Sequence, residues 1–109
     1  ILEKQNLYED ALTAYRRAIY LNPKSIEAQA GIGRILLIKK DYLGATVIYQ
    51  QLLKIIPNNP DAYYGLALSY QRRGLKKEAK LALDTARQLY SDYHNSEGVQ
   101  QVNNLDREL

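Results

Sequence analysis

Apolar residues along this chain fall into stripes at helical spacing, and the stripes come in pairs separated by short polar breaks. Ala28, Ile32 and Ile35 share one face, and Ala45 and Tyr49 begin the next. Steps of three and four residues predict amphipathic α-helices, and no segment alternates as a strand does. We expect helices at roughly 8–21, 26–39, 43–56, 60–73, 77–90 and 96–108, with residues 1–6 closing an earlier helix and 91–95 forming a linker.

Turn residues punctuate these stripes. Asn59 followed by Pro60 predicts a helix start, with an N-cap side chain and a proline in the first turn. Pro57 marks a helix end, because the residue before a proline is pushed out of the α region. Gly74 stands where a glycine in the left-handed conformation ends a helix.

The stripes and turns repeat with a period of 34 residues. Ala11, Ala45 and Ala79 follow this step, and so do Pro23 and Pro57. A fixed period of this length predicts a stacked array of helix pairs, in which each pair covers the apolar face of its neighbour.

The repeat resembles the tetratricopeptide repeat, a 34-residue helix–turn–helix unit. That family prefers small residues at three positions, which are Ala67, Ala79 and Ala86 in the last complete unit. Its aromatic position holds Tyr63 in that unit and Gln29 in the unit before. The resemblance implies an all-α fold of stacked antiparallel helix hairpins, wound as a right-handed superhelical solenoid.

The resemblance also divides the chain. It implies a repeat array over residues 1–93, made of a partial repeat 1–25 and complete repeats 26–59 and 60–93, followed by a C-terminal capping helix within 94–109. Because the chain lacks a starting methionine and opens midway through a repeat, we expect a fragment of a longer protein. The uncovered front of the first unit should leave Tyr15, Ile19 and the Ile1–Leu2 pair partly bare, which favours self-association.

In this family the first helices of successive hairpins line a concave groove that holds partner proteins. The matching positions here are Glu27, Ala30, Gly31, Arg34, Leu37, Ile38, Asp61, Tyr64, Gly65, Leu68, Gln71 and Arg72. Arg34 and Arg72 can grip a carboxylate, and Tyr64 is the type of residue that dominates interfaces. We expect a partner helix or extended segment with apolar anchors and at least one acidic residue.

Two features of the groove have a second interpretation. Gly31 and Gly65 would let a partner backbone approach closely, or they are small because helices pack tightly there. Leu37 and Ile38 would anchor a partner, or a neighbouring hairpin covers them.

Charge is distributed unevenly. Residues 1–90 hold fourteen Lys and Arg against eight Asp and Glu, whereas residues 91–109 hold one against four. Several cations follow the first helices and predict a basic edge: Lys39, Lys40, Arg73, Lys76 and Lys77. The edge could bind an acidic protein or anionic lipid headgroups, or its cations merely complement helix C-termini and keep the surface solvated.

Composition argues against other classes of function. A single histidine, His94, and no cysteine leave little for metal binding or nucleophilic catalysis, so we expect no enzyme and no cofactor. The basic stretch is short and lacks a stacked aromatic platform, which disfavours nucleic acid. No apolar run spans a membrane, so a membrane would be met only by recruitment, and the cytoplasm is the default expectation for this soluble segment.

The sequence therefore predicts a scaffold or adaptor that binds another protein. Two alternatives stay open: an assembly or membrane-recruitment factor that uses the basic edge, and a scaffold that self-assembles by end-to-end stacking.

Overall fold

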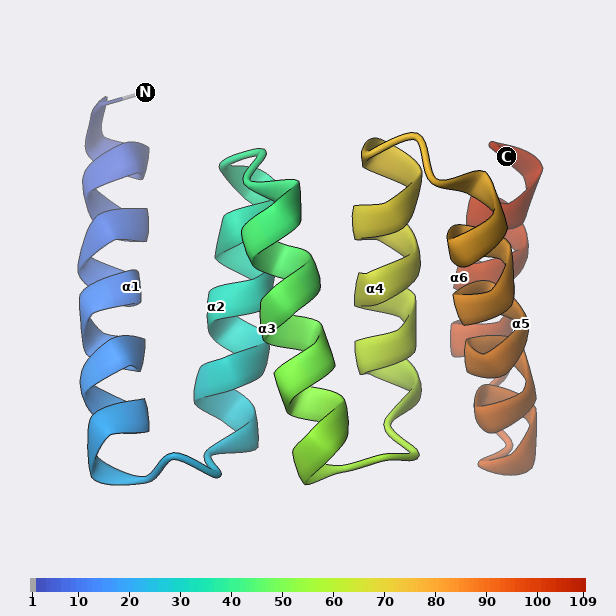
Figure 1. Ribbon diagram of the computed structural model, residues 1–109, viewed down its shortest axis with the longest axis horizontal. Coiled ribbons are helices and arrows are strands. Elements are labelled where there is room, and N and C mark those ends of the chain that lie inside the picture. Colours follow the sequence, from blue (N-terminus) through green and yellow to red (C-terminus); the bar gives the residue numbers. More distant parts are fainter. Residues whose placement is uncertain (1) are drawn as a thin grey trace.

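The computed structural model describes residues 2–109, with side chains from residue 7 onward, and its described part is all-helical. The helices are α1 (Leu2–Leu21), α2 (Ile26–Ile38), α3 (Tyr42–Ile55), α4 (Pro60–Arg72), α5 (Lys76–Asp92) and α6 (Ser96–Arg107). Each packs on its neighbour in the chain, and Figure 1 shows them side by side from α1 at one end to α5 and α6 at the other. The predicted all-α stack of helix hairpins is confirmed.

Polar side chains start four of the helices. Asn59 Oδ1 accepts a hydrogen bond from the Asp61 amide at 3.0 Å, which confirms the predicted cap of α4. Asp41, Asn95 and Ser25 cap α3, α6 and α2 in the same way. These oxygens satisfy amide groups that have no partner inside the helix.

The turns inside the two hairpins share one backbone conformation. Gly74 has a φ of 79°, as predicted for a glycine after a helix, and Lys40 takes a φ of 65° at the corresponding place. The left-handed region suits glycine and strains residues with a Cβ. The α2–α3 turn therefore holds a lysine in a strained conformation that the α4–α5 turn avoids.

Two helix boundaries differ from the sequence-based expectation. Residues 2–21 form one helix, where we expected the end of an earlier helix and then a new start at residue 8. No proline or glycine interrupts that stretch, so nothing breaks the helix. At the other end, α5 continues to Asp92 because Ser91 stands where a proline ends the earlier units, and this shortens the predicted 91–95 linker.

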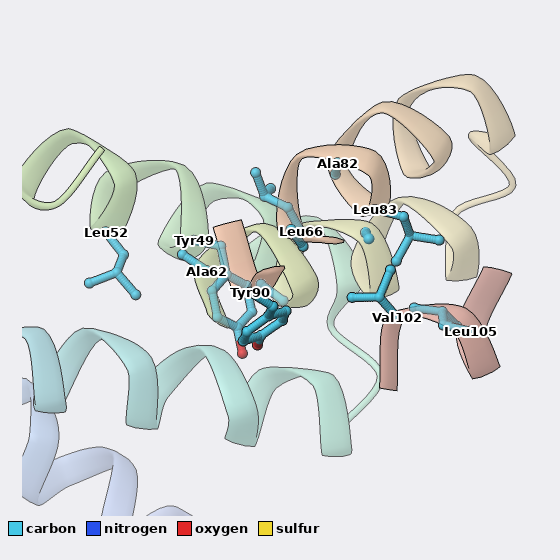
Figure 2. Close-up of a cluster of buried hydrophobic side chains, with 12 residues drawn as sticks. Tyr49, Leu52, Ala62, Leu66, Ala82, Leu83, Tyr90, Val102 and Leu105 are labelled. Carbon is cyan, nitrogen blue, oxygen red and sulfur yellow. The ribbon is translucent and has the colours of Figure 1, made fainter. Parts of the chain in front are cut away.

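The core is divided between two clusters. The larger one draws its buried side chains from α3, α4, α5 and α6, and Figure 2 shows Tyr49, Leu66, Leu83 and Val102 within it. The smaller one joins α1 to α2 through Leu12, Ile32 and Ile35.

The α1 end of the stack is less covered than the rest. Tyr15 and Ile19 are half-buried there, as expected. Further along the helix, Tyr20 is 86% exposed and Leu21 is 76% exposed. The predicted exposure of the Ile1–Leu2 pair concerns side chains outside those that the structure describes.

Candidate functional site

A groove of about 420 Å³ lies between α2 and α4. Side chains of α3 and α5, the helices that follow α2 and α4 in the chain, form its floor. Seven of the residues predicted from the sequence line it: Ala30, Arg34, Leu37, Asp61, Tyr64, Gly65 and Leu68. The groove thus combines apolar walls with one cation from α2 and one anion from α4.

Five residues predicted for the groove are absent from its lining. Glu27 and Arg72 are exposed elsewhere, and Ile38 is 54% exposed without lining the groove. Gln71 donates from Nε2 to Glu108 Oε2 at 3.3 Å, so it packs toward the C-terminal end of the chain. Of the two arginines expected to grip a carboxylate, Arg34 lines the groove and Arg72 does not.

The fifth residue, Gly31, is buried beneath a tyrosine ring, and Gly65 has the same environment. A Cβ built on Gly31 would lie 2.4 Å from Cζ of Tyr15, and one on Gly65 would lie 2.3 Å from Cζ of Tyr49. These distances are far below a van der Waals contact. The glycines are therefore small because a tyrosine of the preceding helix packs on them. That they also let a partner backbone approach stays a prediction.

Sequence reasoning missed the floor of the groove. Tyr49, Leu52 and Tyr90 reach it from α3 and α5, and Gln101 reaches it from α6. The family resemblance assigns the groove to first helices only, which excludes these positions. A signal was available, because Tyr15 and Tyr49 share the 34-residue step with the two glycines that they cover.

One anion of the groove is already engaged. The Tyr90 hydroxyl donates a hydrogen bond to Asp61 Oδ1, and Figure 2 shows the hydroxyl ends of Tyr49 and Tyr90 pointing the same way. Arg34, in contrast, makes no ion pair with any side chain that the structure describes. The groove therefore offers a free cation beside an anion that a phenol holds in place.

Burial shifts the acidity of the groove tyrosines. Desolvation raises the pKa of Tyr49 to about 12; the nearby Arg34 charge opposes this rise, and the Asp61 charge adds to it. The pKa of Tyr90 is also raised, by burial and by its hydrogen bond to Asp61. Burial raises the pKa of Tyr64 as well, with a smaller contribution from Glu108. At neutral pH these hydroxyls are protonated and act as hydrogen-bond donors.

The predicted basic edge is exposed, but its cations have different surroundings. Lys39 caps the end of α2 and pairs with Glu9 of α1. Arg73 caps the end of α4 and donates to Thr46 Oγ1 at 3.4 Å. Lys40 is exposed in the turn after α2. The helix-dipole interpretation suits Lys39 and Arg73, because the C-terminal end of a helix favours cations.

Lys76 and Lys77 do not fit that interpretation. They are the first two residues of α5 and lie at its positive end, where a cation gains nothing from the dipole. Together with Lys80 and the 69%-exposed Leu81, they line a shallow depression on the surface.

Sequence comparison identifies the repeat. The family described as "TPR repeat" matches residues 33–74, and "Tetratricopeptide repeat" matches residues 1–25. The chain belongs to the tetratricopeptide repeat family. Repeats of this family generally mediate protein–protein interaction and typically form scaffolds without catalytic activity.

Two relatives show how far the similarity extends. A TPR repeat-containing protein of Picosynechococcus sp. is 36% identical over 80 residues, which cover 73% of this chain and 21% of that protein. The protein O-mannosyl-transferase TMTC1 of Homo sapiens is 36% identical over 58 residues, or 53% of this chain and 7% of that protein. The chain spans about a fifth or less of the relatives it matches, so the similarity concerns repeats and not whole proteins.

Among residues 2–109, no helix combines the length and the apolar character that a membrane span requires.

Proposed function

We propose that the groove between α2 and α4 binds a helix or extended segment of another protein, through apolar anchors and at least one acidic residue. The observation that carries this proposal is the groove of about 420 Å³, whose lining combines Leu37, Tyr64 and Leu68 with Arg34, a residue that has no ion pair among the described side chains. A hollow of this size, mostly apolar with a few convergent polar groups, is typical of binding sites.

The polar groups of the groove suit an acidic residue. A guanidinium can form two parallel hydrogen bonds to a carboxylate, and Arg34 makes no ion pair within the described residues. Asp61 lines the same groove from α4, where Tyr90 donates to it, and its negative charge would repel a second carboxylate there. The acid of the partner would therefore lie nearer α2 than the start of α4.

We also propose that residues 1–93 form the repeat array and that α6, within residues 94–109, caps it. Val102 and Leu105 of α6 are buried against the larger core cluster. The opposite side of the helix exposes Gln100, Asn103 and Asn104 to solvent. A polar outer face is what the last element of a stacked array needs in water.

Affinity capture with matched variants tests the groove. The native chain, Arg34→Glu/Tyr64→Ala and the control Arg107→Glu/Tyr93→Ala would be compared on lysate of the source organism, with captured proteins quantified by mass spectrometry. The control makes the same changes at two exposed positions outside the groove. Removing an interface aromatic and reversing the central charge should reduce capture of a groove partner by roughly 30-fold.

The outcomes separate the three candidate functions. A protein kept by the control and lost by the groove variant, with both variants as helical as the native chain, supports the groove. Equal capture by all three overturns it. Loss with Lys76→Glu/Lys77→Glu would favour the basic edge, and light scattering that grows with protein concentration would favour self-assembly.

A further inference from the structure

A second cleft lies between α1, α2 and α3 and shares no lining residue with the groove. Its volume is about 480 Å³, inside the range of roughly 300–1,000 Å³ found for ligand pockets. Ile19, Ile32 and Ile48 supply aliphatic walls, one from each helix. Three exposed side chains add polar groups around them: Arg16, Asp41 and Gln51.

A buried amide also lines this cleft. Gln29 is only 5% exposed, and its Oε1 has no hydrogen-bond partner among the residues that the structure describes. Buried polar atoms nearly always have a hydrogen-bond partner. Burial removes an acceptor's hydrogen bonds to water, and this costs free energy unless another donor replaces them. The acceptor is therefore available to a hydrogen-bond donor from outside the described residues, either a water molecule or a group of a ligand, once the amide turns toward the cleft.

The α4–α5 hairpin shows which side chains occupy the equivalent positions one repeat later. One repeat later, the residues equivalent to Gln29 and Leu36 are Tyr63 and Tyr70. Both rings are partly buried and pack against the larger core cluster. The α4–α5 hairpin thus fills this place with two aromatic rings of its own, whereas the α2–α3 hairpin holds an amide and a leucine and leaves a cleft.

We propose that this cleft binds a tyrosine side chain presented by another protein. The ring would take the place that Tyr63 takes one repeat later, against Ile19, Ile32 and Ile48. The phenol hydroxyl would donate to Gln29 Oε1. The last torsion of a glutamine is soft, so the amide can turn toward the cleft, and a hydroxyl can donate or accept in either orientation.

This second site is separate from the groove and does not depend on the function proposed for it. A partner segment that lies over α1 and α3 would reach the cleft without entering the space between α2 and α4. Val47, 45% exposed on α3, extends the apolar surface beside the cleft and would contact residues that flank the tyrosine.

The test uses the 109-residue chain with labelled isoleucine methyl groups, titrated with N-acetyl-tyrosinamide and followed by NMR. We expect shift changes at Ile19, Ile32 and Ile48 and none at Ile55, which does not line the cleft. N-acetyl-phenylalaninamide lacks only the hydroxyl and should bind about five-fold more weakly, which is the effect of one lost hydrogen bond.

Two variants of Gln29 make the test specific. Gln29→Leu removes the acceptor and keeps an apolar wall. N-acetyl-tyrosinamide and N-acetyl-phenylalaninamide should therefore bind this variant equally. Gln29→Tyr places a ring where Tyr63 has one, so it should abolish binding and raise the unfolding midpoint. If Gln29→Tyr does not fold, Gln29→Leu still reports the role of the amide.

Several results would overturn the proposal. Equal binding of the two ligands, with and without the hydroxyl, to the native chain would show that Gln29 does not accept a hydrogen bond from the phenol. Undiminished binding to a folded Gln29→Tyr would place the ligand elsewhere. Shifts of the same methyl groups with protein concentration alone would mean that a second copy occupies the cleft.

Discussion

The α2–α3 and α4–α5 hairpins share one register of 34 residues and fill it with different side chains. Their turns have nearly the same backbone, with φ of 65° at Lys40 and 79° at Gly74. At another shared position α3 carries Tyr49 where α5 carries Leu83, and both are buried. The backbone of a repeat therefore tolerates a redistribution of side-chain volume among its helices.

The comparison also explains where the two candidate sites lie. The large ring of Tyr49 covers Gly65 and forms part of the groove floor, a role that the shorter Leu83 does not have. Conversely, Tyr63 fills a place that Gln29 leaves open. The cleft and the groove floor both arise at positions where the α2–α3 hairpin departs from its neighbour.

The largest effect that would sharpen this comparison comes from the covered glycines. Gly65→Ala should destabilise the fold by about 2 kcal/mol, since the new Cβ meets the Tyr49 ring, which is too enclosed to move. Gly31→Ala should cost less than about 1 kcal/mol, because Tyr15 is half-buried at the end of the stack and can shift. Denaturant unfolding of both variants measures the difference.

A double variant serves as the control for the glycine prediction. Tyr49→Leu/Gly65→Ala should lose less stability than the two single changes added together, because the smaller side chain leaves room for the Cβ. Equal losses for Gly31→Ala and Gly65→Ala would contradict the proposed difference between the two tyrosines.

The next effect is a pH dependence of stability caused by Tyr49, whose equivalent in the α4–α5 hairpin is Leu83. The pKa of Tyr49 is raised from 10.0 to about 12, so the folded state holds this proton more tightly than the unfolded state does. The stabilisation is complete below pH 10 and is lost as the pH rises through 12, by on the order of 1 kcal/mol per pH unit in that window.

Stability measured against pH in native protein and in Tyr49→Phe tests this effect. The variant should lose less stability between pH 10 and 12, and a tyrosinate absorbance titration should lose its late step at Tyr49. Leu83, the equivalent residue of α5, offers no such group. Parallel pH profiles for the two proteins would show that Tyr49 does not contribute to the alkaline loss.

The smallest effect compares the two turns. Lys40→Gly should stabilise the fold by up to about 1 kcal/mol, because glycine adopts a positive φ without strain. Gly74→Lys should destabilise it by a similar amount. Thermal unfolding measures both changes, and Lys40→Ala provides a control that removes the charge and keeps the Cβ. A gain in Lys40→Ala equal to that in Lys40→Gly would assign the effect to charge.

Much of the candidate site was predictable from sequence, and the residues that the prediction left out were missed for one reason. Arg34, Leu37, Tyr64 and Leu68 followed from the resemblance to the tetratricopeptide repeat, which implies that these first-helix positions line the groove, and residues on one face of a helix stay together wherever the helix packs. The floor residues Tyr49 and Tyr90 did not follow, since their place depends on how far a ring reaches between helices.

The sequence by itself determined an all-α stack of hairpins with their turns, because apolar spacing, capping residues and Gly74 act over a few neighbouring residues. Only the tertiary structure decided that Tyr15 and Tyr49 cover Gly31 and Gly65, and that Tyr90 holds Asp61 from 29 residues away. Such contacts depend on the distance and rotation between packed helices, which the periodicity of a single helix does not specify.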